Sequence, residues 1–275
     1  MDRHMNGGEA GDVRELRVER PANNLLRALR AEDLSLLTPH LSPWFADTET
    51  VLYEPGDTVQ TVYFPCGPSL VSYVVMLEDG RGVETALVGR EGALGGIVSQ
   101  GRLPAYARGL VQFPGPFYRI ESRALEEAKA QSATLRYLFA RYADCLLAQV
   151  FQSVACNATH TIEQRVAKWL TAALDRTGDH DVPLTQEQLA SMLGVGRSYI
   201  SRVVQNMKSR GVLETRRGGV RVRDRDQLHQ LSCGCNDAVR AHFDDVLKGV
   251  YPTEEESTVL KLNAGAASPG SRMPG

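Results

Sequence analysis

The chain has 275 residues, enough for about two domains of typical size. Its 43% hydrophobic and 23% charged residues are typical of a globular protein and exclude a disordered or fibrous class. The net charge of -2 hides an uneven distribution, because residues 160–225 hold twelve Lys or Arg against seven Asp or Glu. That basic segment is either a surface that contacts phosphates or a solvated charged face.

The five cysteines are odd in number and mostly scattered, which argues against a disulfide framework and favours a reducing compartment. Residues 1–20 are polar, lack the apolar stretch of a signal peptide, and are expected to be flexible. No apolar run is long enough to span a bilayer. We therefore expect a cytoplasmic protein with no membrane partner.

The first folded part is predicted over residues 21–121. Leucines recur at helical spacing from Asn24 to Leu41, until Pro39 and Pro43 stop the predicted helix. From Thr50 to Ile120 short β-branched and aromatic runs alternate with Gly and Pro. Turn signals about every eight to twelve residues predict an all-β barrel or a double-sheet roll.

Residues 122–156 are predicted to form a long helix, with at most a short leading one, because neither Gly nor Pro occurs between Ser122 and Ala155. Apolar residues along it step by three and four, the spacing of a coiled-coil seam. The predicted dimer interface is Leu135, Phe139, Tyr142, Leu146 and Gln149. The alternative is a helix that packs only on its own domain.

A C-terminal domain is predicted over residues 157–252, beginning with a helix from Thr161 to Leu174. Thr185 to Gln188 form a capping box that starts the next helix, and Gly194 ends it. A further helix runs from Gly196 or Arg197 to Arg210. Two short helices joined by a three-residue turn predict a helix-turn-helix.

The second helix of this pair has two different faces. Its core face follows helical spacing and consists of Ile200, Val203, Val204 and Met207. The opposite face begins at Arg197, carries no acid and includes small serines that permit close approach. Such a face is suited to the major groove of DNA, where arginines bind guanine or phosphates.

Beyond Gly211 two short strands are predicted, with Arg216 to Gly219 at the tip between them. A basic hairpin beside such a helix is a wing that can contact backbone phosphates. The candidate DNA-binding residues are Thr185, Arg197, Ser198, Tyr199, Ser201, Arg202, Arg216 and Arg217.

This order of parts resembles the Crp/Fnr family of bacterial transcription regulators, over about residues 24–223. The likeness is strongest in LTQEQLASMLGVGRSYISRVVQNMKSRGVL, residues 184–213. The resemblance implies an α+β fold, with an N-terminal double-stranded β-helix or jelly roll of the cyclic-nucleotide-binding type, a long dimerisation helix and a C-terminal winged helix-turn-helix. It also implies a homodimer on a palindromic double-stranded DNA site, and RNA polymerase as a partner.

The chain departs from the family pattern at two sites. The family's recognition helix opens Arg-Glu-x-x-x-Arg, and Ser198 replaces that acid, which should change the preference at one base step. Members that bind cyclic AMP carry a Gly-Glu pair and an Arg-Ser/Thr-Ala run, where this chain has Gly95-Gly96 and Ala105-Tyr106-Ala107. Although Arg102 and Arg108 lie close enough in sequence to substitute, we do not expect cyclic AMP to bind, and the effector is left open.

Other functions find less support in the sequence. No cysteine cluster precedes Cys66, so an iron–sulfur centre of the family's N-terminal type is not expected. Cys233 and Cys235 form a close pair that is assigned to helix packing, with redox or metal sensing as the alternative. No catalytic residue or cofactor is predicted, and residues 253–275 are expected to be a disordered tail. The rival function is a protein-interaction adaptor with a partner site on the β-roll and only nonspecific DNA contact.

Overall fold

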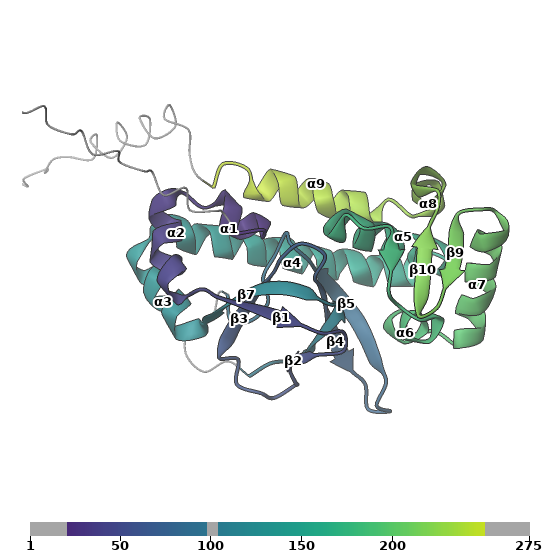
Figure 1. Cartoon of the computed structure of the whole chain (residues 1–275), viewed down its shortest axis with the longest axis horizontal. Coiled ribbons are helices and arrows are strands. Elements are labelled where there is room, and N and C mark those ends of the chain that lie inside the picture. The colour runs from purple at the N-terminus through teal and green to yellow at the C-terminus, as the bar shows by residue number, and fades with distance from the viewer. Residues whose placement is uncertain (1–20, 98–103, 251–275) are drawn as a thin grey trace, which may run out of the picture.

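The computed structural model describes residues 21–97 and 104–250 (Figure 1). The expected flexible N-terminus, the expected disordered tail and Arg102 lie outside these ranges. Within them, no helix combines the length and the hydropathy needed to cross a membrane. The α+β architecture is confirmed: a β-roll comes first, a long helix follows, and a winged helix-turn-helix is near the C-terminus.

Two short helices replace the single helix predicted from Asn24 to Leu41, so that prediction was wrong in its continuity. They are α1 (Asn24–Ala28) and α2 (Ala31–Leu37), followed by the 3-10 turn η1 (Thr38–His40). The chain becomes extended at Leu29, where ψ is 142°. Buried Asn23 accepts from the Leu26 N–H to cap α1 and donates to the carbonyl oxygens of Pro65 and Gly92. These long-range bonds anchor α1 on the roll, which leucine spacing cannot reveal.

The β-roll consists of two antiparallel sheets. One has the order β1 (Ser42–Ala46), β7 (Gly115–Glu121) and β3 (Thr61–Pro65). The other has the order β2 (Val51–Tyr53), β6 (Arg108–Phe113), β4 (Leu70–Met76) and β5 (Gly82–Val88). The roll begins with β1 at Ser42, earlier than the predicted Thr50, and β1 includes Pro43, which was expected to mark a stop. A proline is tolerated there since β1 is an edge strand.

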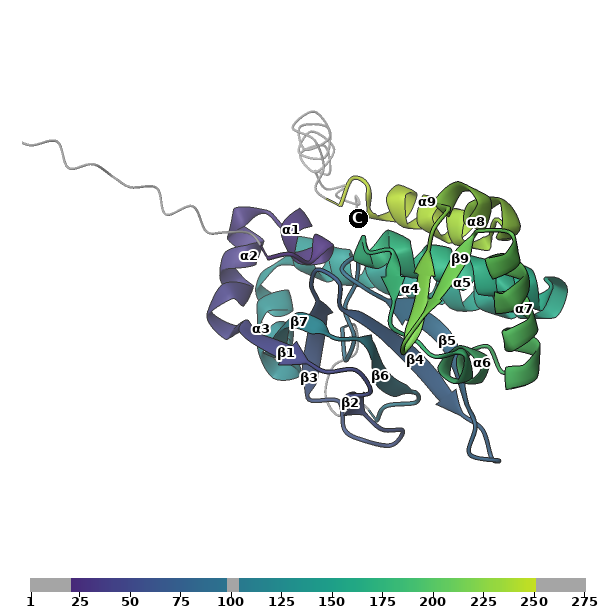
Figure 2. The same ribbon diagram turned by 45° about the vertical axis from the view of Figure 1, so that its right-hand side comes forward.

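The long helical region is divided at Ser132 into α3 (Ser122–Gln131) and α4 (Ala133–Thr159). Ser132 is extended and caps α4 by accepting from the Leu135 N–H at 3.1 Å. α4 packs against the roll on one side. It also packs against α9 (Cys235–Leu247), which runs along it in both views (Figures 1 and 2).

The dimer interface predicted on α4 is wrong, because its face packs within the chain. Leu135, Phe139, Tyr142 and Gln149 are at most 8% exposed, and Leu146 is partly buried against the same core. The Tyr142 hydroxyl both donates to the Ala93 carbonyl oxygen and accepts from the Ala93 N–H, at 3.1 and 3.0 Å. The side-chain amide of Gln149 donates to the Leu87 carbonyl oxygen. We call these five residues the inner stripe.

A second stripe on α4 faces outward and also steps by three and four residues. Its members are Tyr137, Ala140, Asp144, Leu147, Phe151, Val154 and Ala158. The large apolar members are 65% (Tyr137), 49% (Leu147), 64% (Phe151) and 65% (Val154) exposed. This outer stripe is therefore the face of α4 that a second molecule could cover.

The C-terminal part begins with α5 (Ile162–Thr177), which extends three residues beyond the predicted end. It continues through β8 (Asp181–Val182), α6 (Gln186–Met192), α7 (Arg197–Ser209), β9 (Leu213–Arg216), β10 (Gly219–Val222) and α8 (Arg225–Leu231). Trp169 of α5 packs edge-on against Phe113 of the roll, with ring centroids 6.3 Å apart. Both belong to one buried apolar cluster, so the two parts share a core.

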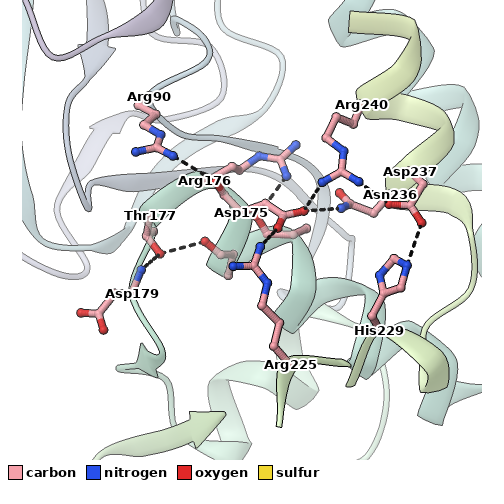
Figure 3. Close-up of polar contacts among 12 residues, drawn as sticks. Arg90, Asp175, Arg176, Thr177, Asp179, Arg225, His229, Asn236, Asp237 and Arg240 are labelled. Carbon is pink, nitrogen blue, oxygen red and sulfur yellow. Dashed lines mark hydrogen bonds and ion pairs between the residues drawn. The ribbon is translucent and has the colours of Figure 1, made fainter. Parts of the chain in front are cut away.

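A polar network centred on Asp175 joins the end of α5 to its neighbours (Figure 3). The carboxylate accepts from Arg225 of α8, and from Asn236 and Arg240 of α9 at 3.0 and 3.2 Å. Arg90 of the roll donates to the Asp175 carbonyl oxygen. The Asp175 side chain is 14% exposed, whereas Arg225 and Arg240 are 49% and 54% exposed, so a largely buried carboxylate links α8 and α9 to α5 through donors that remain partly in contact with water.

Candidate nucleic-acid interface

The helix-turn-helix forms as predicted from local sequence. The Thr185 hydroxyl accepts from the Gln188 N–H at 3.2 Å, while the Gln188 side-chain oxygen accepts from the Thr185 N–H at 2.8 Å. This reciprocal box begins α6. Gly194 then adopts a left-handed φ of +66°, which a residue with a Cβ would adopt only with strain. The chain reverses there, and α7 begins at Arg197.

The core face of α7 is also confirmed. Ile200, Val203, Val204 and Met207 are at most 8% exposed. α7 packs on α6, on α5 and on β9 through this face. The opposite face is consequently held toward solvent by apolar packing.

A buried arginine that the sequence reasoning missed supports the turn. Arg165 of α5 is 9% exposed, and its guanidinium donates to the carbonyl oxygen of Leu193 at 2.8 Å. That carbonyl belongs to the C-terminal cap of α6, where helical partners run out. The available signal was an arginine within the otherwise apolar face of the predicted Thr161–Leu174 helix.

The outer face of α7 presents Arg197, Ser198, Tyr199 and Arg202, all of them exposed. The Arg202 guanidinium lies over the Tyr199 ring, 5.1 Å from its centroid, which orients it without neutralising it. Arg197 is 3.7 Å from Glu187, and the two side chains are 70% and 76% exposed. Such an exposed pair contributes about 0–1 kcal/mol, so Arg197 can exchange it for a phosphate or a base.

Two of the predicted contact residues hold the motif together. The Ser201 hydroxyl donates to the side-chain oxygen of Gln186 at 2.7 Å and is partly buried between α7 and α6. Thr185 is exposed, but its hydroxyl already accepts from the Gln188 N–H and donates to the Gln188 side chain. Both residues therefore position the outer face of α7.

The wing is a tight hairpin of β9 and β10, with β8 as the third strand of the sheet. Its turn is Arg217-Gly218, shorter than the predicted tip, because Arg216 and Gly219 pair with each other within the strands. Gly219 lies so close to β8 that a Cβ would be 2.4 Å from the Val182 carbonyl oxygen. The close approach of two backbones therefore explains that glycine.

Acids from neighbouring strands neutralise much of the wing's charge. Arg221 binds Asp181 in a bidentate pair and lowers the pKa of that carboxyl, while Arg223 binds Glu214. Arg216 lies 3.7 Å from Glu214 and 3.9 Å from Asp181. Arg217 is exposed and has no ion-pair partner in the parts of the chain described. Counting charges along the sequence therefore overstated the free charge of the wing, and Arg217 is its most available cation.

The β-roll contacts the helix-turn-helix directly. The Gln188 side-chain amide of α6 donates to the Glu49 carboxylate at 3.0 Å, and Gly194 lies against Val83 of β5. Nearby, the Trp169 indole N–H donates to the Glu84 carboxylate at 2.8 Å. Burial raises the pKa of Glu84 to about 7, against the opposing effect of its hydrogen bonds with Ser72 and Trp169. Contacts with the roll thus help to set where the outer face of α7 points.

The candidate effector region of the roll carries little unpaired charge in its described part. Arg108, one of the two arginines that could replace the missing phosphate ligand, forms an ion pair with Glu54 at 2.8 Å. Tyr106 is 85% exposed and points away from the roll's core. Gly95 has a φ of +114°, and a Cβ there would be 2.6 Å from the Thr61 carbonyl oxygen, so this position requires glycine for backbone packing.

Known proteins resemble the chain in one domain and in overall fold. A family model described as the Crp-like helix-turn-helix domain matches residues 164–231. FixK2 from Bradyrhizobium japonicum is 17% identical with a TM-score of 0.60, over 70% of this chain and 98% of that one. The c-di-GMP responsive global regulator CLP of Xanthomonas campestris is 17% identical with a TM-score of 0.58, over 71% and 100%.

A transcriptional regulator of the CRP family from Thermus thermophilus, TTHB099, is 20% identical with a TM-score of 0.58, over 69% of this chain and 96% of that one. No curated protein matches the chain. At these identities the solved structures establish a shared fold.

Proposed function

We propose that this chain, which carries a Crp-like helix-turn-helix domain on the fold of the Crp/Fnr transcription regulators, is a sequence-specific DNA-binding regulator. The observation that carries the proposal is the outer face of α7. Arg197 and Arg202 project from the N-terminal half of a helix whose other face is fixed in the core. That end of a recognition helix enters the major groove, where each arginine can bind guanine in a bidentate manner.

Ser198 and Tyr199 lie between the two arginines and would read or pack against the same base pairs. Arg217 at the wing tip would bind a phosphate on the flanking backbone, which positions the helix without reading sequence. The exposed pair of Arg197 with Glu187 would open when DNA binds, because its free energy is small beside that of a charge-assisted bond to a base or phosphate.

We propose a homodimer formed through the outer stripe of α4. The outer stripe has coiled-coil spacing, and pairing with a second copy of α4 would cover the exposed stripes of both molecules. A two-fold dimer would present two α7 helices to a palindromic site, with half-sites about one helical turn apart. RNA polymerase is the further partner expected from the family resemblance.

We propose that cyclic AMP does not control this dimer. Gly96 and Ala105-Tyr106-Ala107 supply neither the carboxylate nor the guanidinium that hold the ribose and phosphate in family members that bind it, and Arg108 is already paired with Glu54. Binding isotherms with cyclic AMP should show no saturable heat. A saturable isotherm would contradict this part of the proposal.

The main test is selection of bound sequences from random DNA, followed by footprinting at several salt concentrations. Arg202→Ala should lower the ratio of specific to nonspecific affinity by about 5- to 150-fold, the equivalent of 1–3 kcal/mol for a bidentate base contact. Arg210→Ala is the matched control, since Arg210 follows the last turn of α7 and lies 3.5 Å from Glu163. It should leave the specificity ratio unchanged.

The alternative function, a protein-interaction adaptor, predicts a different footprint. A protein that contacts only phosphates covers all sequences evenly, and its affinity falls steeply with salt. Uniform coverage by the wild-type protein, with no sequence enriched by selection, would favour the adaptor. An unchanged specificity ratio in Arg202→Ala would show that the outer face of α7 does not read the bases.

A further inference from the structure

Four side chains that can ligate a metal ion meet where α4 ends and α9 begins. Cys156 lies in the last turn of α4, and His160 is that helix's C-terminal cap. Cys233 and Cys235 flank Gly234, the N-terminal cap of α9. The four ligand atoms all lie within 4.8 Å of one another, and no other such group is found among the described residues.

We propose that this Cys3His site binds one zinc ion. Tetrahedral zinc has bonds of about 2.3 Å to sulfur and 2.0–2.1 Å to nitrogen, which places two sulfur ligands about 3.8 Å apart and a sulfur about 3.5 Å from a nitrogen. The Cys156 and Cys233 sulfurs are 3.7 Å apart. The Cys235 sulfur is 3.5 Å from Nδ1 of His160. Both distances match those of a four-coordinate site.

The chemistry of the donors also selects zinc. Three thiols and an imidazole are soft or borderline ligands, which favour zinc over magnesium or calcium, and a complete set of four protein ligands is the arrangement of a structural zinc site. Cys156, Cys233 and Cys235 are 0%, 6% and 4% exposed. They form a small cluster separate from the large apolar cores, so general core packing does not account for them.

Groups around the site would stabilise the thiolates. The Gln152 side-chain amide donates to the Cys235 sulfur at 3.1 Å. Lys168 lines the same small cavity as Gln152 and Cys235, so its positive charge lies near the cluster. Zinc displaces thiol protons when it binds. Three thiolates, a neutral histidine and the dication sum to one negative charge, which Lys168 would balance.

The ion would hold two distant parts of the chain together. Cys156 and Cys233 are 77 residues apart in sequence, and α5, the helix-turn-helix and the wing all lie between them. Zinc bound to both pairs of ligands closes that loop and pins the start of α9 to the end of α4. The proposed site therefore fixes the base of the segment that carries the outer face of α7.

Metal binding is measured on the full-length protein in the absence of DNA, so the result does not depend on the proposed function. Protein purified under reducing conditions and supplied with zinc should retain one zinc ion per chain by elemental analysis. Cobalt substitution should give the thiolate-to-metal charge-transfer absorption and the intense visible bands of a tetrahedral site. A wild-type protein that retains no stoichiometric metal and shows no such spectrum would overturn the proposal.

Variants locate the ion. Gln152→Ala removes a hydrogen bond to a ligand and should weaken zinc affinity by roughly 10- to 100-fold. Cys233→Ala and Cys235→Ala each remove a ligand and should weaken zinc affinity by more than this. Cys145→Ala is the matched control, a buried cysteine elsewhere on α4, and should leave affinity unchanged. His160→Cys should keep one ion and alter the cobalt spectrum, which shows a folded site directly.

Three results would count against zinc at this site. One is iron with acid-labile sulfide in place of zinc. Another is a disulfide between Cys156 and Cys233 in protein prepared under reducing conditions. The third is equal loss of metal in Cys145→Ala and Cys233→Ala.

Discussion

Replacing Phe151 by glutamate tests which stripe of α4 a second copy covers. Phe151 is 64% exposed, and a phenylalanine offers about 150–250 Å² of surface, so a partner would cover about 100–160 Å² on each copy. At about 25 cal/mol per Å², this amounts to about 2.5–4 kcal/mol per copy, or about 5–8 kcal/mol for a symmetric dimer. Phe151→Glu removes that burial and brings two carboxylates together, so the dimer dissociation constant should rise by at least about 1000-fold.

Sedimentation equilibrium over a wide concentration range measures this change. Phe45→Glu is the matched control, because Phe45 is 61% exposed on β1 and does not lie on α4. Phe139→Ala on the inner stripe gives a different outcome. Phe139 is 1% exposed and stacks edge-on against Phe64, so the change should lower the free energy of unfolding by about 3–5 kcal/mol.

An interface on the outer stripe is refuted if Phe151→Glu remains a dimer at concentrations where the wild type is one. It is also refuted if Phe45→Glu dissociates the dimer instead, because the interface would then lie on the roll. A wild-type protein that is monomeric at every concentration would remove the dimer from the proposed function.

Three further changes probe the interface and its supports. The pKa of Glu84 is raised from 4.5 to about 7, so its contribution to the free energy of unfolding is complete below pH 4.5 and is lost as the pH rises through 7. Glu84→Gln should remove up to about 3 kcal/mol from the difference between the free energies of unfolding measured in urea at pH 5 and at pH 8. An unchanged difference would contradict this role of Glu84. Arg165→Met leaves the Leu193 carbonyl oxygen without its donor and should lower the free energy of unfolding in urea by about 1–3 kcal/mol. DNA binding should also weaken, although Arg165 is not on the outer face of α7. An unchanged free energy of unfolding would refute this role of Arg165. Ser198→Glu should shift selected sites toward cytosine at one base step, and identical selected sites would show that Ser198 does not face a base.

Features fixed by neighbours in sequence could be predicted. The Thr185 capping box and the core face of α7 depend on residues three or four apart, and the Gly194 turn depends on one glycine with a left-handed φ; all three form as expected. The β-roll was predicted as a class because turn residues recur between short apolar runs. Its first strand was missed because Pro43 indicates a stop unless the strand is known to be at an edge.

Charge on the candidate interface was only partly predictable. The sequence identifies the arginines of α7 and the wing, but not which acids lie beside them. Asp181 reaches Arg221 across 40 residues, and Glu187 reaches Arg197 from the preceding helix. Pairing across a sheet or between helices is set by the fold, so the free charge on Arg202 and Arg217 could be assigned only from the structure.

By itself, the sequence determined that α4 is a long helix with apolar residues at three- and four-residue steps, and that a helix-turn-helix with an arginine face follows. Only the tertiary structure decided which stripe of α4 is buried and which is open. The inner and outer stripes have the same spacing, and the roll and α9 cover one of them. The Cys3His site was hidden for the same reason, since its two halves lie 77 residues apart. Periodicity specifies the faces of a helix, whereas long-range packing selects the face that is buried.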